Sequence, residues 1–213
     1  MAPVLLAVET STSVMSVALF DGATLVGSLE REGRGEIIVS LIDELLRGRG
    51  ASVRDVTRWA VDIGPGSFTG VRSGVATVKG IAFATGAEIV GVTAFDALAE
   101  GKDAITLLDA GKGEVYFRIG SGGEPGHAPL DVVRAMIENR EAQRSDSRRS
   151  LSGARGAEPS VSIEGRAEPV VGPGIAPRAQ AVGRVALGRA PDDIDRLEPF
   201  YVRAPDLTRP RVP

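Results

Sequence analysis

The chain has 213 residues, one histidine, no cysteine and a formal net charge of -3. The absence of thiols excludes disulfides and cysteine nucleophiles, and a lone histidine cannot make the three- or four-ligand Cys/His site that binds zinc. No apolar run approaches the roughly 18 residues of a membrane span, and the N-terminus lacks the basic region of a signal peptide, so a cytoplasmic location is expected. The slightly acidic balance argues against a large nucleic-acid surface.

Three strands are predicted before any helix. Residues 4–8 form a continuous apolar run, which is typical of a strand buried on both faces. Residues 14–20 form a second run, and the tight-turn dipeptide Asp21-Gly22 leads into a returning strand over 24–30.

Two long helices are expected in the rest of the first half. Apolar residues recur with a 3.6-residue period over 37–46 and predict an amphipathic helix. A second helix runs from about Ser67 to Thr85 and ends at Gly86. The remaining predicted elements are a short helical turn at 53–57, strands at 59–63 and 88–92, and a helix at 94–100 capped by Thr93.

A second unit is predicted to begin near Lys102, which divides the chain into residues 1–101 and 102–213. Its opening strand pair resembles that of the first unit and hints at a duplication. A polar stretch over 141–168 is expected to be poorly packed. The predicted elements are strands at 104–109 and 114–119, a glycine-rich loop at 120–128, a helix at 130–139, a short strand at 170–171, a helix at 176–187 and an irregular tail from Pro191.

Residues 64–72, Gly-Pro-Gly-Ser-Phe-Thr-Gly-Val-Arg, join a strand to a helix through a glycine-rich turn. Helix N-termini bind anions through their free N–H groups, so a phosphate site is one interpretation. The segment has neither the Walker A spacing nor the Gly-x-Gly-x-x-Gly spacing of dinucleotide sites. The simpler interpretation is that the glycines permit a sharp turn and that Ser67 or Thr69 caps the helix.

The helix after this turn carries an apolar line and a line of small residues. Glycine costs a helix interior roughly 1 kcal/mol relative to alanine, so something should pack closely on the small face. One interpretation is packing within the domain, and the other is that one side faces the sheet while another faces a partner chain. The apolar line is Val71, Val75, Val78 and Ala82, and the small line is Gly70, Ser73, Gly74, Thr77, Gly80 and Ala84.

Glu9-Thr10-Ser11-Thr12 ends the first strand and is a candidate turn for a metal-bound phosphate, although a hydroxyl-rich turn that joins two hairpin strands is the plainer interpretation and is favoured. Asp109 ends a strand of the second unit and could pair with Glu9 across the two units. Glu114 and Tyr116 are explained by a half-buried sheet face. His127 is interpreted as a solvated loop residue rather than a catalytic one.

Several of these segments together resemble the bacterial TsaB (YeaZ) family, which is needed for tRNA threonylcarbamoyladenosine biosynthesis. The glycine-rich block is the most specific of them, and the likeness is strong over residues 4–119, weak over 120–190 and recovers at the end. The matching segments are residues 5–12, 16–19, 64–72, 91–99, Asp109 with 113–116, and 198–203.

The resemblance implies an α/β structure with the actin-like ATPase (sugar kinase/Hsp70/actin) fold, in which two subdomains hold mixed β-sheets flanked by helices. It also implies a non-catalytic relative of TsaD, the enzyme that transfers the threonylcarbamoyl group to adenosine in ANN-decoding tRNAs. TsaD-type proteins hold metal through a histidine pair on a helix, and nothing in this chain matches that pair. Older labels call such proteins M22 glycoprotease homologues, but one loop histidine gives no basis for proteolysis.

In the resembling proteins the two long helices form a bundle that mediates homodimerisation or, in its place, pairing with TsaD. A TsaE-type ATPase joins the larger assembly, ATP is expected only there, and tRNA would be contacted indirectly. No catalytic or metal-binding residue is assigned in this chain, and Glu9, Thr10, Ser11 and Asp109 are assigned only as possible phosphate-facing residues. The residues assigned to partner binding are Ile38, Leu41, Ile42, Leu45, Phe68, Val71, Arg72, Gly74, Val75 and Val78.

The chain departs from the family pattern at Gly35, Val39-Ser40 and Gly111, where the family often has His, Leu-Pro and Arg. An alternative function is a stand-alone ATPase or phosphotransferase of the actin-like superfamily. Against it, the turn at 9–12 lacks an Asp and a glycine-rich loop, and the second unit offers no clear adenosine motif.

Overall fold

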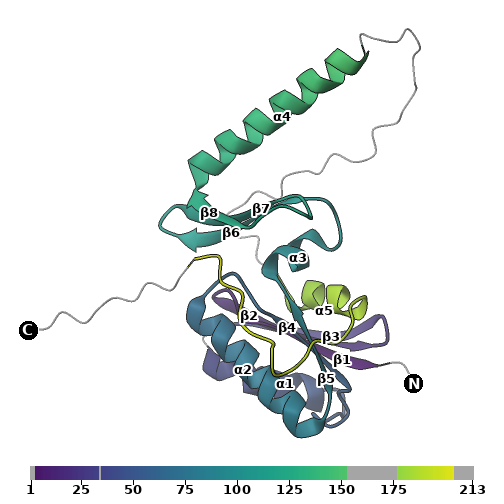
Figure 1. The fold of residues 1–213 in the computed structure, drawn as a ribbon. Helices are drawn as coiled ribbons and strands as arrows, with labels where there is room; N and C mark the ends of the chain where they lie inside the picture. Colours follow the sequence, from purple (N-terminus) through teal and green to yellow (C-terminus); the bar gives the residue numbers. More distant parts are fainter. Residues whose placement is uncertain (1–2, 34, 153–176, 204–213) are drawn as a thin grey trace, which may run out of the picture.

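The computed structural model describes residues 3–33, 35–152 and 177–203. They form a five-stranded sheet and a three-stranded sheet, with helix α3 (Ala94–Ala99) between them (Figure 1). A short 3-10 helix, η1 (Gly35–Ile37), precedes α1. The remaining α-helices are α1 (Ile38–Arg47), α2 (Phe68–Thr85), α4 (Leu130–Ser152) and α5 (Ala179–Leu187). None of the helices in these ranges is long and apolar enough to cross a membrane.

The first sheet is mixed and has the order β3-β2-β1-β4-β5. Strands β1 and β3 pair antiparallel with β2, whereas β4 pairs parallel with both β1 and β5. The predicted strands of the first unit are thereby confirmed with shifts of one or two residues at their ends. The strands are β1 (Val4–Glu9), β2 (Val14–Asp21), β3 (Thr24–Glu32), β4 (Arg58–Asp62) and β5 (Glu88–Val92).

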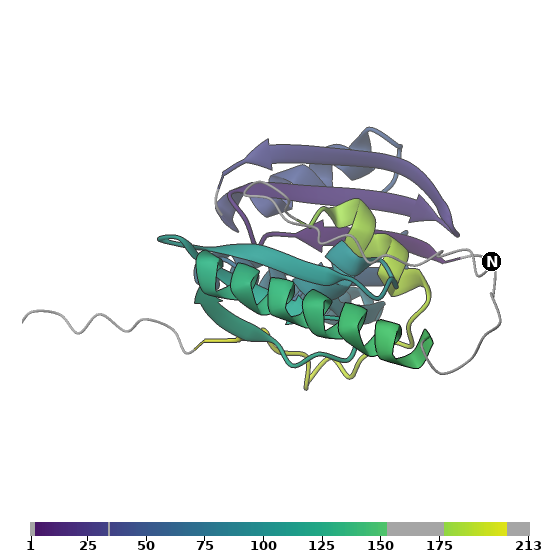
Figure 2. The same cartoon turned by 90° about the horizontal axis from the view of Figure 1, so that it is seen from above.

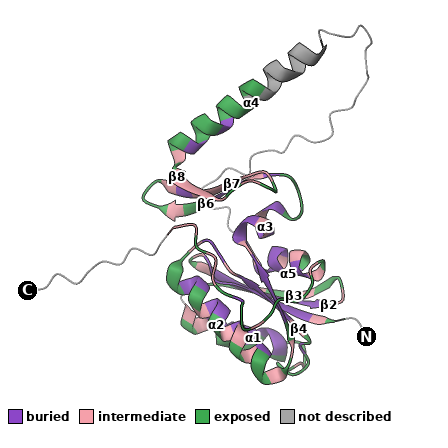
Figure 3. Ribbon diagram, in the orientation of Figure 1, coloured by how far each residue is buried: buried purple, intermediate pink, exposed green. Residues whose placement is uncertain are grey.

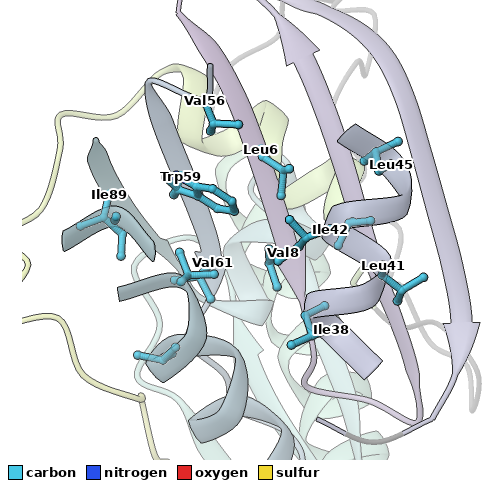
Figure 4. Packing of buried hydrophobic residues seen from close by; sticks show 14 of the residues in the cluster. Leu6, Val8, Ile38, Leu41, Ile42, Leu45, Val56, Trp59, Val61 and Ile89 are labelled. Carbon is cyan, nitrogen blue, oxygen red and sulfur yellow. The ribbon is translucent and has the colours of Figure 1, made fainter. Parts of the chain in front are cut away.

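Alternation along β1 gives this sheet two apolar faces. Leu6 and Val8 point to the face covered by α1 and α2, where Trp59 is fully buried among them (Figure 4). Leu5 and Ala7 point to the opposite face, which α5 covers. The sheet is therefore the middle layer of three, with helices on both sides.

The second sheet is antiparallel and has the order β6-β7-β8. Helix α4 covers one face through Val133 and Ile137, and its far end extends away from the strands (Figures 1 and 2). The other face packs on Phe95 of α3 and on Phe200 near the C-terminal end. The strands are β6 (Ile105–Gly111), β7 (Glu114–Ile119) and β8 (Gly126–Pro129).

Several elements differ from the prediction. Strand β8 lies inside the segment predicted as a glycine-rich loop, because pairing with β7 rather than local propensity defines it. Helix α4 continues to Ser152, well into the segment expected to be poorly packed, and residues 53–57 form turns without a helix. The rest of that polar segment and the predicted strand at 170–171 lie outside the described residues.

Helix α5 belongs spatially to the first sheet, although the sequence prediction assigned it to residues 102–213. It packs on β1, β2 and β4, and the backbone N–H of Ala179 donates to Ser16 Oγ in β2 at 2.9 Å. We call the first sheet together with α1, α2 and α5 the first body. It is built from segments on both sides of the second sheet in the sequence, while the division between residues 101 and 102 stays a prediction.

Candidate functional site

The glycine-rich segment packs closely on the turn that follows β1. Ser67 N–H donates to the Ser11 carbonyl at 2.7 Å, and Thr10 Oγ1 donates to the Gly70 carbonyl at 2.9 Å. A Cβ on Gly70 would collide with the Thr10 carbonyl. Ser67 Oγ caps α2 by accepting from Gly70 N–H at 3.2 Å, which confirms the capping interpretation. The glycines therefore allow the start of α2 to approach the turn.

Two acidic side chains lie buried beside this contact. Glu9 ends β1 and Asp62 ends β4, the adjacent parallel strand, and both have no exposed surface. Glu9 Oε1 accepts from Ser11 N–H at 2.6 Å and from Ser11 Oγ at 2.7 Å. Asp62 Oδ1 accepts from Gly64 N–H at 2.7 Å, while its Oδ2 is buried with no hydrogen-bond partner in the described structure.

Burial controls the protonation of this carboxyl pair. Burial, reinforced by the nearby charge of Asp62, raises the pKa of Glu9 from 4.5 to about 8. Burial also raises the pKa of Asp62 from 3.8 to about 6. The pair therefore retains a proton at neutral pH, and both side chains lie out of solvent.

The predicted phosphate-facing residues are not brought together as expected. Glu9, Thr10 and Ser11 are buried, and the carboxyl neighbour of Glu9 is Asp62 rather than Asp109. Asp109 lies exposed in the second sheet, where its Oδ1 accepts from Gly111 N–H. Asp62 was missed by the sequence analysis, although its place at a strand end just before Gly64 was a usable signal. No group of three or more His, Asp or Glu side chains suited to a metal occurs in the described ranges.

Most residues assigned to partner binding lie in the core. The face of α1 that carries Ile38 and Leu41 packs on the sheet (Figure 4). The face of α2 that carries Val75 also belongs to this core. Because these side chains are sealed against the sheet, they offer no exposed contact surface, and their assignment to partner binding stays a prediction. The buried residues are Ile38, Leu41, Ile42, Leu45, Val71, Gly74, Val75 and Val78.

Helix α2 carries both buried and exposed residues along its length (Figure 3). Two of the assigned residues, Phe68 and Arg72, are exposed, and they begin a line along the outside of α2. We call this line the outer stripe of α2. Phe83 at its far end is 77% exposed, and a Cβ on Gly80 would have open space around it. The outer stripe consists of Phe68, Arg72, Ala76, Gly80 and Phe83.

His127 is not the solvated loop residue that the sequence suggested. It lies in β8, its Nε2 is 3.0 Å from Glu114 Oε2, and its ring packs 5.3 Å from that of Tyr116. Arg203 also reaches Glu114, with Nη1 to Oε2 at 3.3 Å. These contacts give His127 a structural setting within the second sheet.

A mixed sheet with helices on both faces, next to a smaller antiparallel sheet, defines an actin-like ATPase-type α/β fold. Two solved structures support this class. A Pseudomonas aeruginosa protein described as similar to peptidase YEAZ has a TM-score of 0.66 at 22% identity and covers 94% of this chain and 100% of its own. YeaZ from Pseudomonas aeruginosa has a TM-score of 0.65 at 21% identity, covering 93% and 99%. At such identities the likeness establishes the fold alone.

About half of the chain also matches known proteins in sequence. The model of the TsaD family, tRNA N6-adenosine threonylcarbamoyltransferase, matches residues 32–124. The chain is 34% identical over 122 residues to the tRNA threonylcarbamoyladenosine biosynthesis protein TsaB of Haemophilus influenzae and, over the same length, to that of Escherichia coli. These matches cover 53% of this chain and 52% and 53% of the relatives, so the matched region spans about half of their length. Over the matched region, the chain is similar to TsaB proteins and to the TsaD family.

Proposed function

We propose that this chain is a non-catalytic subunit in the formation of N6-threonylcarbamoyladenosine on tRNA, where it pairs with a TsaD-type enzyme and stabilises it. The observation that carries the proposal is the outer stripe of α2. It replaces the buried residues of the sequence prediction as the contact surface, while the two helices themselves remain the binding elements.

The composition of the outer stripe suits contact with another helix. Ala76 and Gly80 lack bulk, so a second backbone can approach closely, and Phe68 and Phe83 stand at the two ends. Glycine inside an exposed helix costs about 1 kcal/mol relative to alanine, and nothing in the described structure covers Gly80. A partner surface explains why a residue unfavourable to the helix stands there.

The turn at residues 9–12 supports a role without catalysis. A phosphate would need free N–H and O–H donors, but those of Ser11 donate to Glu9, and the Thr10 hydroxyl donates to Gly70. The buried carboxyl pair would also repel an anion. We therefore assign ATP only to the larger assembly with a TsaE-type ATPase, and tRNA contact to the enzyme partner.

The same surface would serve a second copy of this chain when the enzyme is absent, so homodimer and heterodimer should exclude each other. Mixing experiments can show this. Adding the TsaD-type protein to the isolated chain should convert a homodimer peak into a heterodimer peak in size-exclusion chromatography.

The decisive test is Gly80→Arg, with Gly122→Arg as the matched control. At both glycines a Cβ meets no atom within 4 Å, and neither has a positive φ, so both variants should fold. Gly80→Arg places a long charged side chain in the outer stripe and should abolish co-purification with the TsaD-type protein and tRNA modification in a reconstituted assay. Gly122→Arg, in the β7–β8 connection, should behave like wild type. Equal pairing by both variants would contradict the interface.

A further inference from the structure

The chain after α5 returns along the first body as a strap, which we define as residues 192–203. Asp192 N–H donates to the Ile89 carbonyl at 2.8 Å, and Phe200 N–H donates to the Ile63 carbonyl at 2.7 Å. Lys79 Nζ on α2 donates to the Leu197 carbonyl at 2.8 Å. The strap is thus fixed to the backbone of the first sheet and to α2.

Side chains at the end of the strap alternate between core and surface. Phe200 and Val202 pack with Phe95 and Leu108 between the two sheets. Tyr201 turns outward, is 43% exposed, and holds its ring 5.4 Å from that of Phe68 at the start of α2. The flanking apolar contacts therefore anchor Tyr201 against the first residue of the outer stripe.

Arg72 completes this exposed group. Its guanidinium carbon lies 5.0 Å from the centre of the Phe68 ring, so the cation rests on the aromatic face. Among the described residues no acidic side chain lies within ion-pair distance of Arg72. Its charge is unneutralised, and a guanidinium restrained by a ring loses less conformational freedom when it binds a carboxylate.

We propose that Tyr201, Phe68 and Arg72 form one recognition element that binds a carboxylate side chain of the TsaD-type partner. The carboxylate would take the free N–H donors of Arg72 while the apolar part of the same residue packs beside Tyr201. This inference rests on the proposed function, because it names the chemistry of the partner at one end of the same surface.

Charge favours a protein carboxylate over a nucleic-acid phosphate. A nucleic-acid backbone is held by several cations along its length. The charged residues of α2 are Arg72 and Lys79, and the Lys79 amine is already bound to the Leu197 carbonyl. With a formal net charge of -3, the chain suits a single carboxylate better than a row of phosphates.

The test separates the contribution of the Arg72 charge from that of the Tyr201 ring. For each variant, the Kd for the purified TsaD-type protein is measured at low and high salt. Arg72→Glu should weaken binding by tenfold or more, and Arg72→Gln should weaken it less while removing most of its salt dependence. Tyr201→Ala should weaken binding severalfold, whereas Tyr201→Phe should bind like wild type because it keeps the ring. All four substitutions are at the two exposed positions Arg72 and Tyr201, so thermal unfolding should stay near wild type.

The outcomes separate this inference from the proposed function. If Gly80→Arg prevents pairing but Arg72→Glu and Tyr201→Ala bind with wild-type Kd and salt dependence, the recognition element is refuted and the interface stands. If Gly80→Arg also pairs normally, the interface itself is refuted. If the Arg72 variants lose affinity for tRNA alone and keep their affinity for the protein, the carboxylate assignment is overturned in favour of a nucleic-acid contact.

Discussion

Glu9 and Asp62 end neighbouring parallel strands and lie side by side without solvent, tied to the protein through Ser11 and Gly64. Ser16 extends the arrangement toward α5, since its hydroxyl lies 3.5 Å from Glu9 Oε2 and accepts from Ala179 N–H. The pair therefore stands where the starts of α2 and α5 meet the first sheet. Its protonation should affect how firmly both helices are held.

Stability should fall as pH rises from about 4.5 to about 8. Within this window the folded chain keeps a proton on Glu9, whose pKa is raised to about 8, while the unfolded chain has lost it. The folded state then binds more protons, so the free energy of unfolding decreases with pH, by an amount on the order of a few kcal/mol. Urea denaturation across this range measures the effect.

Glu9→Gln provides the control for this pH dependence. Glutamine keeps the acceptor oxygen and cannot ionise, so most of the decrease above pH about 6 should disappear. Asp62, with its pKa raised to about 6, would still contribute at lower pH. An unchanged slope in Glu9→Gln would show that Glu9 ionises normally in the folded protein.

Two glycines of α2 should respond to alanine in opposite ways. Gly70→Ala drives a Cβ into the Thr10 carbonyl and should destabilise the protein by roughly 1–3 kcal/mol. Gly80→Ala meets nothing and should stabilise it by about 0.5–1 kcal/mol through helix propensity. Thermal or chemical unfolding of both variants checks the prediction. If Gly70→Ala stabilised the protein as Gly80→Ala does, the close approach of α2 to Thr10 would be contradicted.

Glutamate substitutions on the two faces of α2 should separate folding from binding. Val75 is 3% exposed, so Val75→Glu buries a charge in the core and should unfold the protein or cost several kcal/mol. Phe83 is 77% exposed, so Phe83→Glu should leave the unfolding transition nearly unchanged while weakening pairing with the TsaD-type protein. Circular dichroism together with a pull-down distinguishes the two, and a misfolded Phe83→Glu would contradict the assigned faces.

Asp96 should be a strong tie between the two sheets. Its carboxylate lies 2.7 Å from Arg118 of β7 and 2.7 Å from Arg189 beyond α5. Burial opposes ionisation, but hydrogen bonds from both arginines hold the pKa of Asp96 below its usual range. Asp96→Ala leaves the half-buried Arg118 without its partner and should cost roughly 2–4 kcal/mol in the free energy of unfolding.

The matched control for Asp96 is the exposed ion pair between Glu100 and Arg184, at 2.7 Å. Glu100→Gln should cost less than about 1 kcal/mol, because solvent screens surface pairs. Because the pKa of Asp96 is lowered, its contribution should be present at neutral pH and disappear as pH falls below about 4. Equal losses in Asp96→Ala and Glu100→Gln would contradict the central role of Asp96.

Much of the first sheet was predictable because its information is local. The apolar runs and the Asp21-Gly22 turn within residues 4–30 predict their strands, and the period over 37–46 predicts α1. The same kind of period also limits the prediction of the contact surface. An apolar line such as Val71 and Val75 shows that a helix face is covered, but it does not distinguish a sheet of the same chain from a partner.

The rest depended on contacts between distant segments. Strand β8 is a four-residue strand that begins with glycine, and only its pairing with β7 defines it. The return of α5 to the first sheet joins Ala179 to Ser16, and no local pattern carries that information. The carboxyl pair likewise depends on β1 and β4 being neighbours, which is why Glu9 was given the wrong acidic partner.

The layer formed by α5 also sets an order of events during synthesis on the ribosome. The face of β1 that carries Leu5 and Ala7 is covered by Val182, which is translated long after them. Until α5 is synthesised, its side chains cannot cover this apolar surface. A nascent chain that stalls before α5 would therefore expose the middle layer of its first body, and a chaperone that recognises extended apolar strands should bind it at this stage.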